Sequence, residues 1–173
     1  MYDAHRNAMT GTAEAIRLYD AAIDRLLRYD PAVLEHTAAL LTEEGSTPLA
    51  HALFAYLNLT TTDQPAVAAA AGALQALDGL SLNDRETAHR AVIEAWVGGD
   101  WFAVSRRLDD LLVQWPTDVL ALMIGHQVDF FVGDAQNLRD RVARSLPALD
   151  GHEHQAFVRQ GWLGRTMNRI WPF

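Results

Sequence analysis

Signals for the start of a helix recur along this chain at even intervals. Pro31, Pro48 and Pro65 are evenly spaced, and each stands at the beginning of a run in which apolar residues return every three or four positions. Proline suits the first turn of a helix, because its φ is already helical and its missing N–H needs no partner there. One helix with a tight turn fills about 17 residues, half of a helix–turn–helix repeat of about 34. The spacing therefore predicts successive antiparallel helix pairs.

The same helical periodicity extends over most of the sequence, and no segment shows the strict alternation of a strand. The apolar stripes fall in residues 16–27, 34–41, 48–57, 65–77, 83–96, 101–112, 120–131 and 138–146. Asn83 and Glu86 have the spacing of a capping box at the start of one of these stripes. We expect an all-α fold of about eight or nine helices, stacked as an alpha–alpha superhelix of antiparallel pairs. Residues 1–150 would form this tetratricopeptide-like domain, and residues 151–173 a helical or irregular tail.

Composition restricts the compartment and the partners. The chain has no cysteine, which favours a reducing, cytoplasmic location, and its polar first residues do not form a secretory signal. The longest stretch poor in charge is interrupted by prolines and threonines, so no membrane span is expected. The net charge is −8, and all 14 basic residues are arginine. Because phosphate binding needs a surplus of cations, we do not expect a nucleic-acid partner.

Residues 83–134 resemble a tetratricopeptide unit. A Gly98–Gly99–Asp100 turn precedes the aromatic Trp101, and Pro116 follows about half a repeat later. The chain is also similar, over about residues 12–149, to the tetratricopeptide repeat protein 38 family. The matching motifs are an "RE…H…A" helix, a glycine-rich turn, and "PTD…LAL…H…F…G" before an arginine-rich helix. The residues that carry them are Arg85, Glu86, His89, Pro116, Thr117, Asp118, Leu120, Ala121, Leu122, His126, Phe130, Phe131 and Gly133.

That resemblance implies a fold of helical repeats and no particular activity. Members of the family are longer than this chain, and residues 151–173 do not follow the pattern of the family's next helix. We therefore expect a shortened form or an N-terminal part of such a protein. The tail places Trp162, Trp171 and Phe173 among arginines. Such an aromatic end could support self-association as a homodimer.

His89, His126 and Asp129 are the candidate site residues. His126 and Asp129 lie one turn apart and share a helix face, and His89 stands on an earlier helix that should stack nearby. Such a set can bind a small ligand or move protons, but polar residues also form purely structural networks. We favour hydrogen-bonded groups lining a groove, and expect neither a metal nor a cofactor. The adjacent pair His152 and His154 lacks the spacing of a helical zinc motif, and we expect it in a solvated loop.

No motif for a nucleophile or a phosphate loop is present. The sequence thus favours a non-catalytic interaction module or scaffold that binds a protein or peptide in a concave groove. The alternative is an enzyme or small-ligand-binding protein whose groove site is built from His89, His126 and Asp129.

Overall fold

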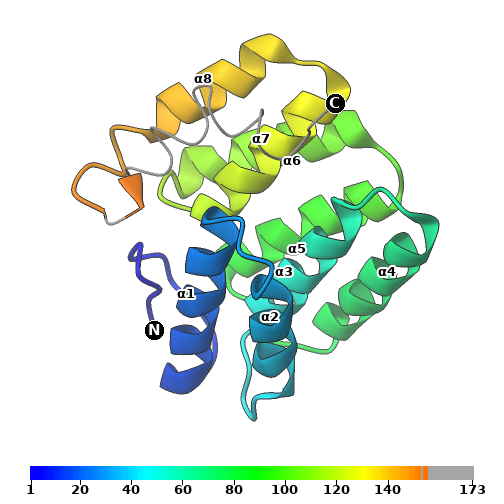
Figure 1. Ribbon diagram of the computed structural model, residues 1–173, viewed down its shortest axis with the longest axis vertical. Helices are drawn as coiled ribbons and strands as arrows, with labels where there is room; N and C mark the ends of the chain where they lie inside the picture. Colours follow the sequence, from blue (N-terminus) through cyan, green and yellow to red (C-terminus); the bar gives the residue numbers. More distant parts are fainter. Residues whose placement is uncertain (153, 156–173) are drawn as a thin grey trace.

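The computed structural model describes residues 1–152 and 154–155. In this part of the chain it shows eight helices and no β-strand (Figure 1). The helices are α1 (Ala13–Leu27), α2 (Val33–Thr42), α3 (Pro48–Leu59), α4 (Gln64–Asp78), α5 (Asp84–Val97), α6 (Trp101–Gln114), α7 (Val119–Val132) and α8 (Ala135–Ser145). The predicted all-helical class is confirmed for the described residues.

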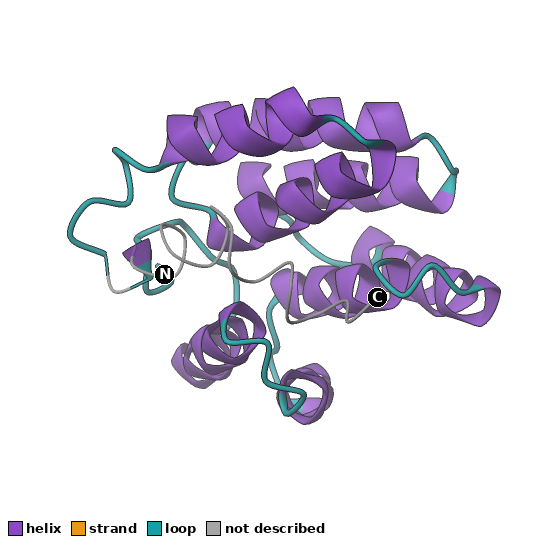
Figure 2. Ribbon diagram, turned by 45° about the horizontal axis from the view of Figure 1, so that its top comes forward, coloured by secondary structure: helices purple, strands orange, loops and turns teal. Residues whose placement is uncertain are grey.

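Each helix contacts the next one along the chain. The pairs α1/α2, α3/α4, α5/α6 and α7/α8 are helical hairpins (Figure 1). The second helix of each of the first three hairpins contacts the helix that follows, and α3 also packs against α5. Figure 2 shows the described chain as helices joined by loops. One continuous cluster of buried apolar side chains runs through all eight helices. No described helix has the length and apolar character needed to cross a membrane.

The four hairpins share one kind of turn. In each turn a residue with positive φ is followed by an aspartate, at Tyr29–Asp30, Thr62–Asp63, Gly99–Asp100 and Gly133–Asp134. Their φ values are 55°, 62°, 80° and 75°. Glycine reaches this left-handed region without strain, whereas Tyr29 and Thr62 adopt it at a conformational cost. The recurrence shows that the turn geometry is set by the hairpin and not by one residue type.

Hydrogen bonds close these turns in the same way. The amides of Asp30, Asp100 and Asp134 each donate to the carbonyl five residues earlier, at 3.0, 3.0 and 2.8 Å. The carboxylates of Asp100 and Asp134 then cap α6 and α8 by accepting from the amides of Ala103 and Asn137, both at 2.8 Å. A cap of this kind satisfies a backbone donor that the helix leaves unpaired.

The first helix of each hairpin also begins alike. Each of these helices has a polar N-cap whose side chain accepts a hydrogen bond from a backbone amide of the first turn. The N-caps of α1, α3, α5 and α7 are, in this order, Thr12, Thr47, Asn83 and Asp118. These caps are 35, 36 and 35 residues apart. The predicted capping box of Asn83 with its glutamate is present and confirmed.

The proline signals are confirmed at two of the three positions. Pro48 and Pro65 lie in the first turns of α3 and α4. Pro31 precedes α2, which begins only at Val33, because Asp30 ties the intervening turn by accepting from the Ala32 amide at 2.9 Å. Residue 153 and residues 156–173 lie outside the described residues, and so do the predictions made for them.

Candidate functional site

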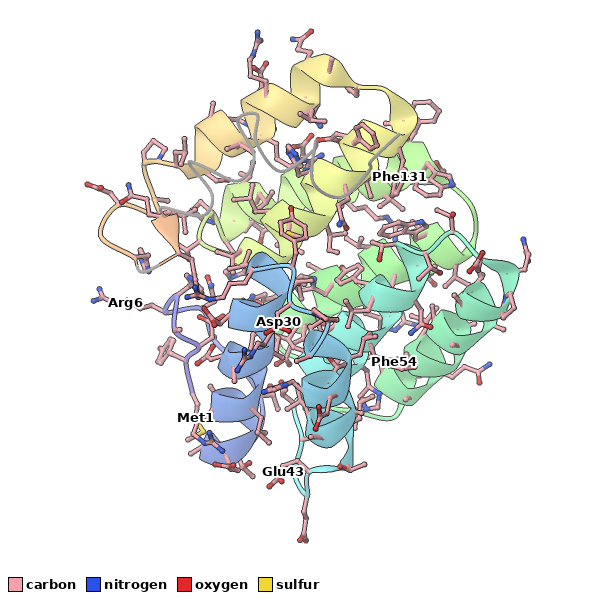
Figure 3. All side chains as sticks on the ribbon, viewed as in Figure 1. Met1, Arg6, Asp30, Glu43, Phe54 and Phe131 are labelled. Atoms are coloured by element: carbon pink, nitrogen blue, oxygen red, sulfur yellow. The ribbon has the colours of Figure 1, made fainter. Side chains whose placement is uncertain are left out.

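A hairpin-like segment at residues 1–11, closed by an antiparallel bridge between Tyr2 and Ala8, packs against the helices, although no sequence pattern predicts it. Its side chains alternate, so that Asp3, His5, Asn7 and Met9 are buried while their neighbours are mostly exposed. Asp3 holds the turn of the segment by accepting from the amides of residues 5 and 7, both at 2.9 Å. Arg6, labelled in Figure 3, extends away from the helices at φ 64°. We call residues 1–11 the N-terminal segment.

The N-terminal segment contributes to a buried polar cluster, which we call the Arg85 network. Arg85 donates from Nε to Asp118 Oδ2 at 2.6 Å and from Nη1 to Asp3 Oδ2 at 2.8 Å. His89 Nε2 lies 2.9 Å from the same Asp118 oxygen, and its Nδ1 lies 2.9 Å from the Tyr56 hydroxyl. The five residues come from the N-terminal segment, α3, α5 and the cap of α7, so the network joins three hairpins to that segment.

The charges of this network are fixed by its geometry. Burial opposes ionisation of Asp118, but the charge of Arg85 and the hydrogen bond from His89 hold the pKa of Asp118 well below its usual value. Burial alone would lower the pKa of Arg85, whereas Asp118 raises it above the usual value. Burial raises the pKa of Tyr56 well above its usual value, so its hydroxyl stays neutral. Asp118 is therefore an ionised carboxylate paired with Arg85.

Hydrogen-bonded contacts link Tyr56 to His89 and His89 to Asp118. This is the order in which a nucleophile, a base and an orienting acid are linked in some active sites. All three side chains, however, are 0% exposed. Burial of this kind fits a hydrogen-bonded network that stabilises the packing of three hairpins.

A second polar cluster, the Asp129 network, joins α6, α7 and α8. Arg141 makes a two-pronged pair with Asp129, donating from Nε at 2.8 Å and from Nη2 at 2.9 Å. Ser105 donates to the same carboxylate at 2.9 Å, and Arg141 Nη1 lies 3.0 Å from Asp109. The Arg141 side chain passes over Gly125, where a Cβ would come within 2.7 Å of it. Any larger residue at position 125 would therefore have to displace the Arg141 side chain.

The candidate residues from the sequence divide between these two clusters. His126 lies one turn before Asp129 on α7, and burial lowers the pKa of His126 while the Asp129 charge acts in the opposite direction. His89 belongs to the Arg85 network instead, among different partners. The described residues include no group of three or more His, Asp or Glu side chains that could hold a metal ion.

Three cavities on the described surface were candidates for ligand sites, and their lining includes none of His89, His126 and Asp129. A polar cleft of about 420 Å³ lies between α6 and α8. A smaller one of about 250 Å³ lies beside it, over Leu112 and Pro116. The third, of about 570 Å³, is the apolar cleft. Its lining comes from α1, α2, α3, α7 and the α1–α2 turn: Leu26, Arg28, Tyr29, Asp30, Pro31, Val33, Leu34, Leu57, Thr60, Met123, Ile124 and Gln127.

His154 does not lie in a solvated loop, and in this respect the prediction was wrong. The side chain is buried, with Nδ1 2.8 Å from His5 Nε2 and Nε2 3.3 Å from Asp24 on α1. The ring of His152 stacks on His5 at 5.8 Å. Burial and the nearby His154 lower the pKa of His5 to about 4. The start of the predicted tail is thus fixed against the N-terminal segment and α1.

Comparison with known proteins adds no further assignment. No family model matches the chain, and no solved structure matches it. The fold and the two networks define an all-helical protein of four consecutive hairpins over the described residues. Its similarity to the tetratricopeptide repeat protein 38 family stays a prediction from the sequence.

Proposed function

We propose that this chain is a tetratricopeptide-like helical repeat protein, without chemistry of its own, that binds a protein or peptide partner in the apolar cleft. The single observation that carries the proposal is the repeated unit. The same N-cap, helix, left-handed turn with aspartate and second helix recur four times, with caps 35, 36 and 35 residues apart. This period is close to the length of a tetratricopeptide unit, about 34 residues.

Repeats of this kind stack side by side, and a small constant rotation between them produces a curved superhelix with a concave binding surface. The contacts between consecutive helices, and between α3 and α5, support such a stack. Repeat proteins use the concave side for extended peptides or a partner helix.

The apolar cleft has the composition that such a partner requires. Leu34 is 63% exposed and Tyr29 is 39% exposed, and both line the cleft beside Met123 and Ile124. Exposed large apolar side chains gathered in a concave place are typical of a binding surface. Arg28 and Asp30 among the lining residues supply polar groups that can orient a bound segment.

The other function suggested by the sequence, catalysis or small-ligand binding around His89, His126 and Asp129, receives less support. His89 lies in one network and Asp129 in the other, and both side chains are 0% exposed. A binding role for the chain as a repeat protein needs neither of them at the surface.

Peptide selection tests the proposal. A displayed library of short random peptides is selected on the full chain, and the selected peptides are synthesised and titrated into ¹⁵N-labelled protein. We expect amide shifts in residues 26–34, 57–60 and 123–127, and at least tenfold weaker binding to Leu34→Asp. Leu80→Asp, at another exposed leucine outside the cleft, should bind as the parent does. Shifts confined to other helices, or equal binding to both variants, would overturn the proposal.

A further inference from the structure

The N-terminal segment crosses the starts of three consecutive helical hairpins in their order along the chain. Gly11 passes the cap of α3, where a Cβ on this glycine would lie 3.2 Å from Thr47 Cβ. The Thr10 amide donates to Glu86 Oε1 in the first turn of α5, at 2.7 Å. The other oxygen of Glu86 accepts from the Asn83 amide at 2.9 Å. The glutamate of the capping box therefore both starts α5 and holds the N-terminal segment.

The segment makes its remaining contacts of this kind at the start of α7. Thr117 Oγ1 lies 3.1 Å from the His5 carbonyl oxygen and 2.9 Å from Asn7 Oδ1. Between α5 and α7, Arg85 Nη1 donates to Asp3 Oδ2 at 2.8 Å. The starts of the hairpins thus form a row that already binds a stretch of peptide, which here is the beginning of the same chain. We call this row the hairpin-start site, formed by Thr47, Asn83, Arg85, Glu86 and Thr117.

The hairpin-start site contacts three different kinds of side chain in the segment. Arg85 pairs with the carboxylate of Asp3, and both side chains are only 2% exposed. Asn7, four residues later, supplies an amide to the start of α7, and Met9 adds an apolar side chain to the buried core. A ligand that lacks one of these groups would leave a buried polar group unpaired or a gap in the core, so the site is selective.

The segment can leave this site without disrupting either partner. Its ends are tied to each other, because the Met9 amide donates to the Met1 carbonyl at 2.9 Å. When Asp3 leaves, Arg85 keeps the Asp118 carboxylate at 2.6 Å, so the arginine still has a counter-charge. Local opening therefore frees Arg85 Nη1 for another carboxylate while the helical hairpins stay paired.

We propose that the hairpin-start site binds an acidic turn of a partner protein, and that the N-terminal segment occupies the site as a tethered competitor. The partner's turn carries a carboxylate, a side-chain amide four residues later and an apolar side chain two residues after the amide, as Asp3, Asn7 and Met9 do. Because the chain's own segment is covalently attached, its effective concentration at the site is in the millimolar range. A partner displaces it by binding more tightly. No residue of this site lines the apolar cleft, so the inference does not depend on the proposed function.

Peptide binding to full-length chains tests this site. A peptide of residues 1–11, labelled with fluorescein at its C-terminus, is titrated by fluorescence anisotropy into the parent and into Asp3→Ala/Asn7→Ala, whose own segment is weakened. We expect binding about tenfold tighter to the variant than to the parent, and about tenfold weaker for a peptide that itself carries Asp3→Ala. Adding Thr117→Val to the variant should weaken binding about fivefold. Thr61→Val, at an exposed threonine of another turn, is the matched control and should not.

A second variant serves if circular dichroism shows that the double variant is unfolded. It keeps the native segment and inserts about twenty Gly and Ser residues after Thr10, which lowers the effective concentration of the segment without removing its contacts. The peptide should bind this chain about threefold more tightly than the parent. Equal affinity for the parent and the folded variants, or equal binding of the two peptides, overturns the inference. So does a doubled mass of the parent in light scattering that Asp3→Ala lacks, because the site would then hold the segment of a second copy.

Discussion

Arg85 Nε and Asp118 Oδ2 lie 2.6 Å apart, and neither side chain has more than 2% of its surface exposed. The other oxygen of Asp118 accepts from the Ala121 amide at 2.9 Å and so caps α7. The Asp118 carboxylate therefore caps α7 and also accepts hydrogen bonds from Arg85 and the His89 ring. The cost of burying these charges is offset only while every partner is in place.

Replacing Asp118 with asparagine should destabilise the protein strongly. The amide can still cap α7, but it leaves the buried Arg85 with the Asp3 carboxylate as its remaining ion-pair partner. Removing one partner of a buried pair costs about 3–5 kcal/mol. Urea unfolding followed by circular dichroism measures this loss. Asp78→Asn, which breaks an exposed pair with Arg90, should cost below about 1 kcal/mol; similar losses in the two variants would contradict the structural role of Asp118.

Two glycines in helices should respond oppositely to alanine. Gly125→Ala places a Cβ 2.7 Å from the Arg141 side chain, which its pair with Asp129 holds in place, and should cost about 1–3 kcal/mol. Gly72→Ala, in the middle of α4, meets nothing within 4 Å and should stabilise the protein by about 0.5–1 kcal/mol. Thermal unfolding of both variants gives the comparison. A stabilised Gly125→Ala would show that Arg141 moves freely.

The N-terminal segment should be held down by Asp3. Asp3→Ala removes both the pair with Arg85 and the acceptor that closes the segment's turn, so the backbone around Arg6 should open more often. Brief trypsin treatment followed by mass spectrometry should show cleavage after Arg6 at least tenfold faster than in the parent. Tyr2→Ala, at a side chain 71% exposed, is the control and should leave the rate unchanged. Equal rates in the three proteins would argue against a docked segment.

Stability should fall in mild acid through His5. The pKa of His5 is about 4 in the folded protein, lowered by burial and by His154, against 6.5 in an unfolded chain. Between these values the unfolded chain binds more protons, so the free energy of unfolding decreases as the pH falls from 6.5 to 4, by about 2–3 kcal/mol from this group. His5→Gln should flatten that part of the pH profile in urea titrations. An unchanged slope would assign the acid sensitivity to other groups.

Local features of this structure were predictable and distant ones were not. The capping box at Asn83 and the Gly99–Asp100 turn depend on neighbours within a few residues, and both are present as expected. The contacts of Asn7 with Thr117 join residues 110 apart, which no periodicity or motif indicates. Arg85 appeared only as part of a family motif, because nothing in its own neighbourhood predicts burial of an arginine.

The candidate site shows the same division. His126 and Asp129 were predicted to share a face because both lie on one helix, and this depends only on helical geometry. Whether the His89 side chain lies near His126 and Asp129 depends on the packing of α5 relative to α7, which local sequence does not determine. The cap of α7, Asp118, takes His89 as its partner instead. The apolar cleft combines side chains from four helices, so no single stretch of sequence indicates it.

The N-terminal segment also determines the order in which the fold can be completed during synthesis. Asp3 and Asn7 leave the ribosome long before Arg85 and Thr117, their counterparts in the finished structure. The first hairpins can form as they emerge, but Arg85 has no complete set of counter-charges until the cap of α7 has been translated. The contacts that complete the fold are therefore made by residues synthesised well before their partners.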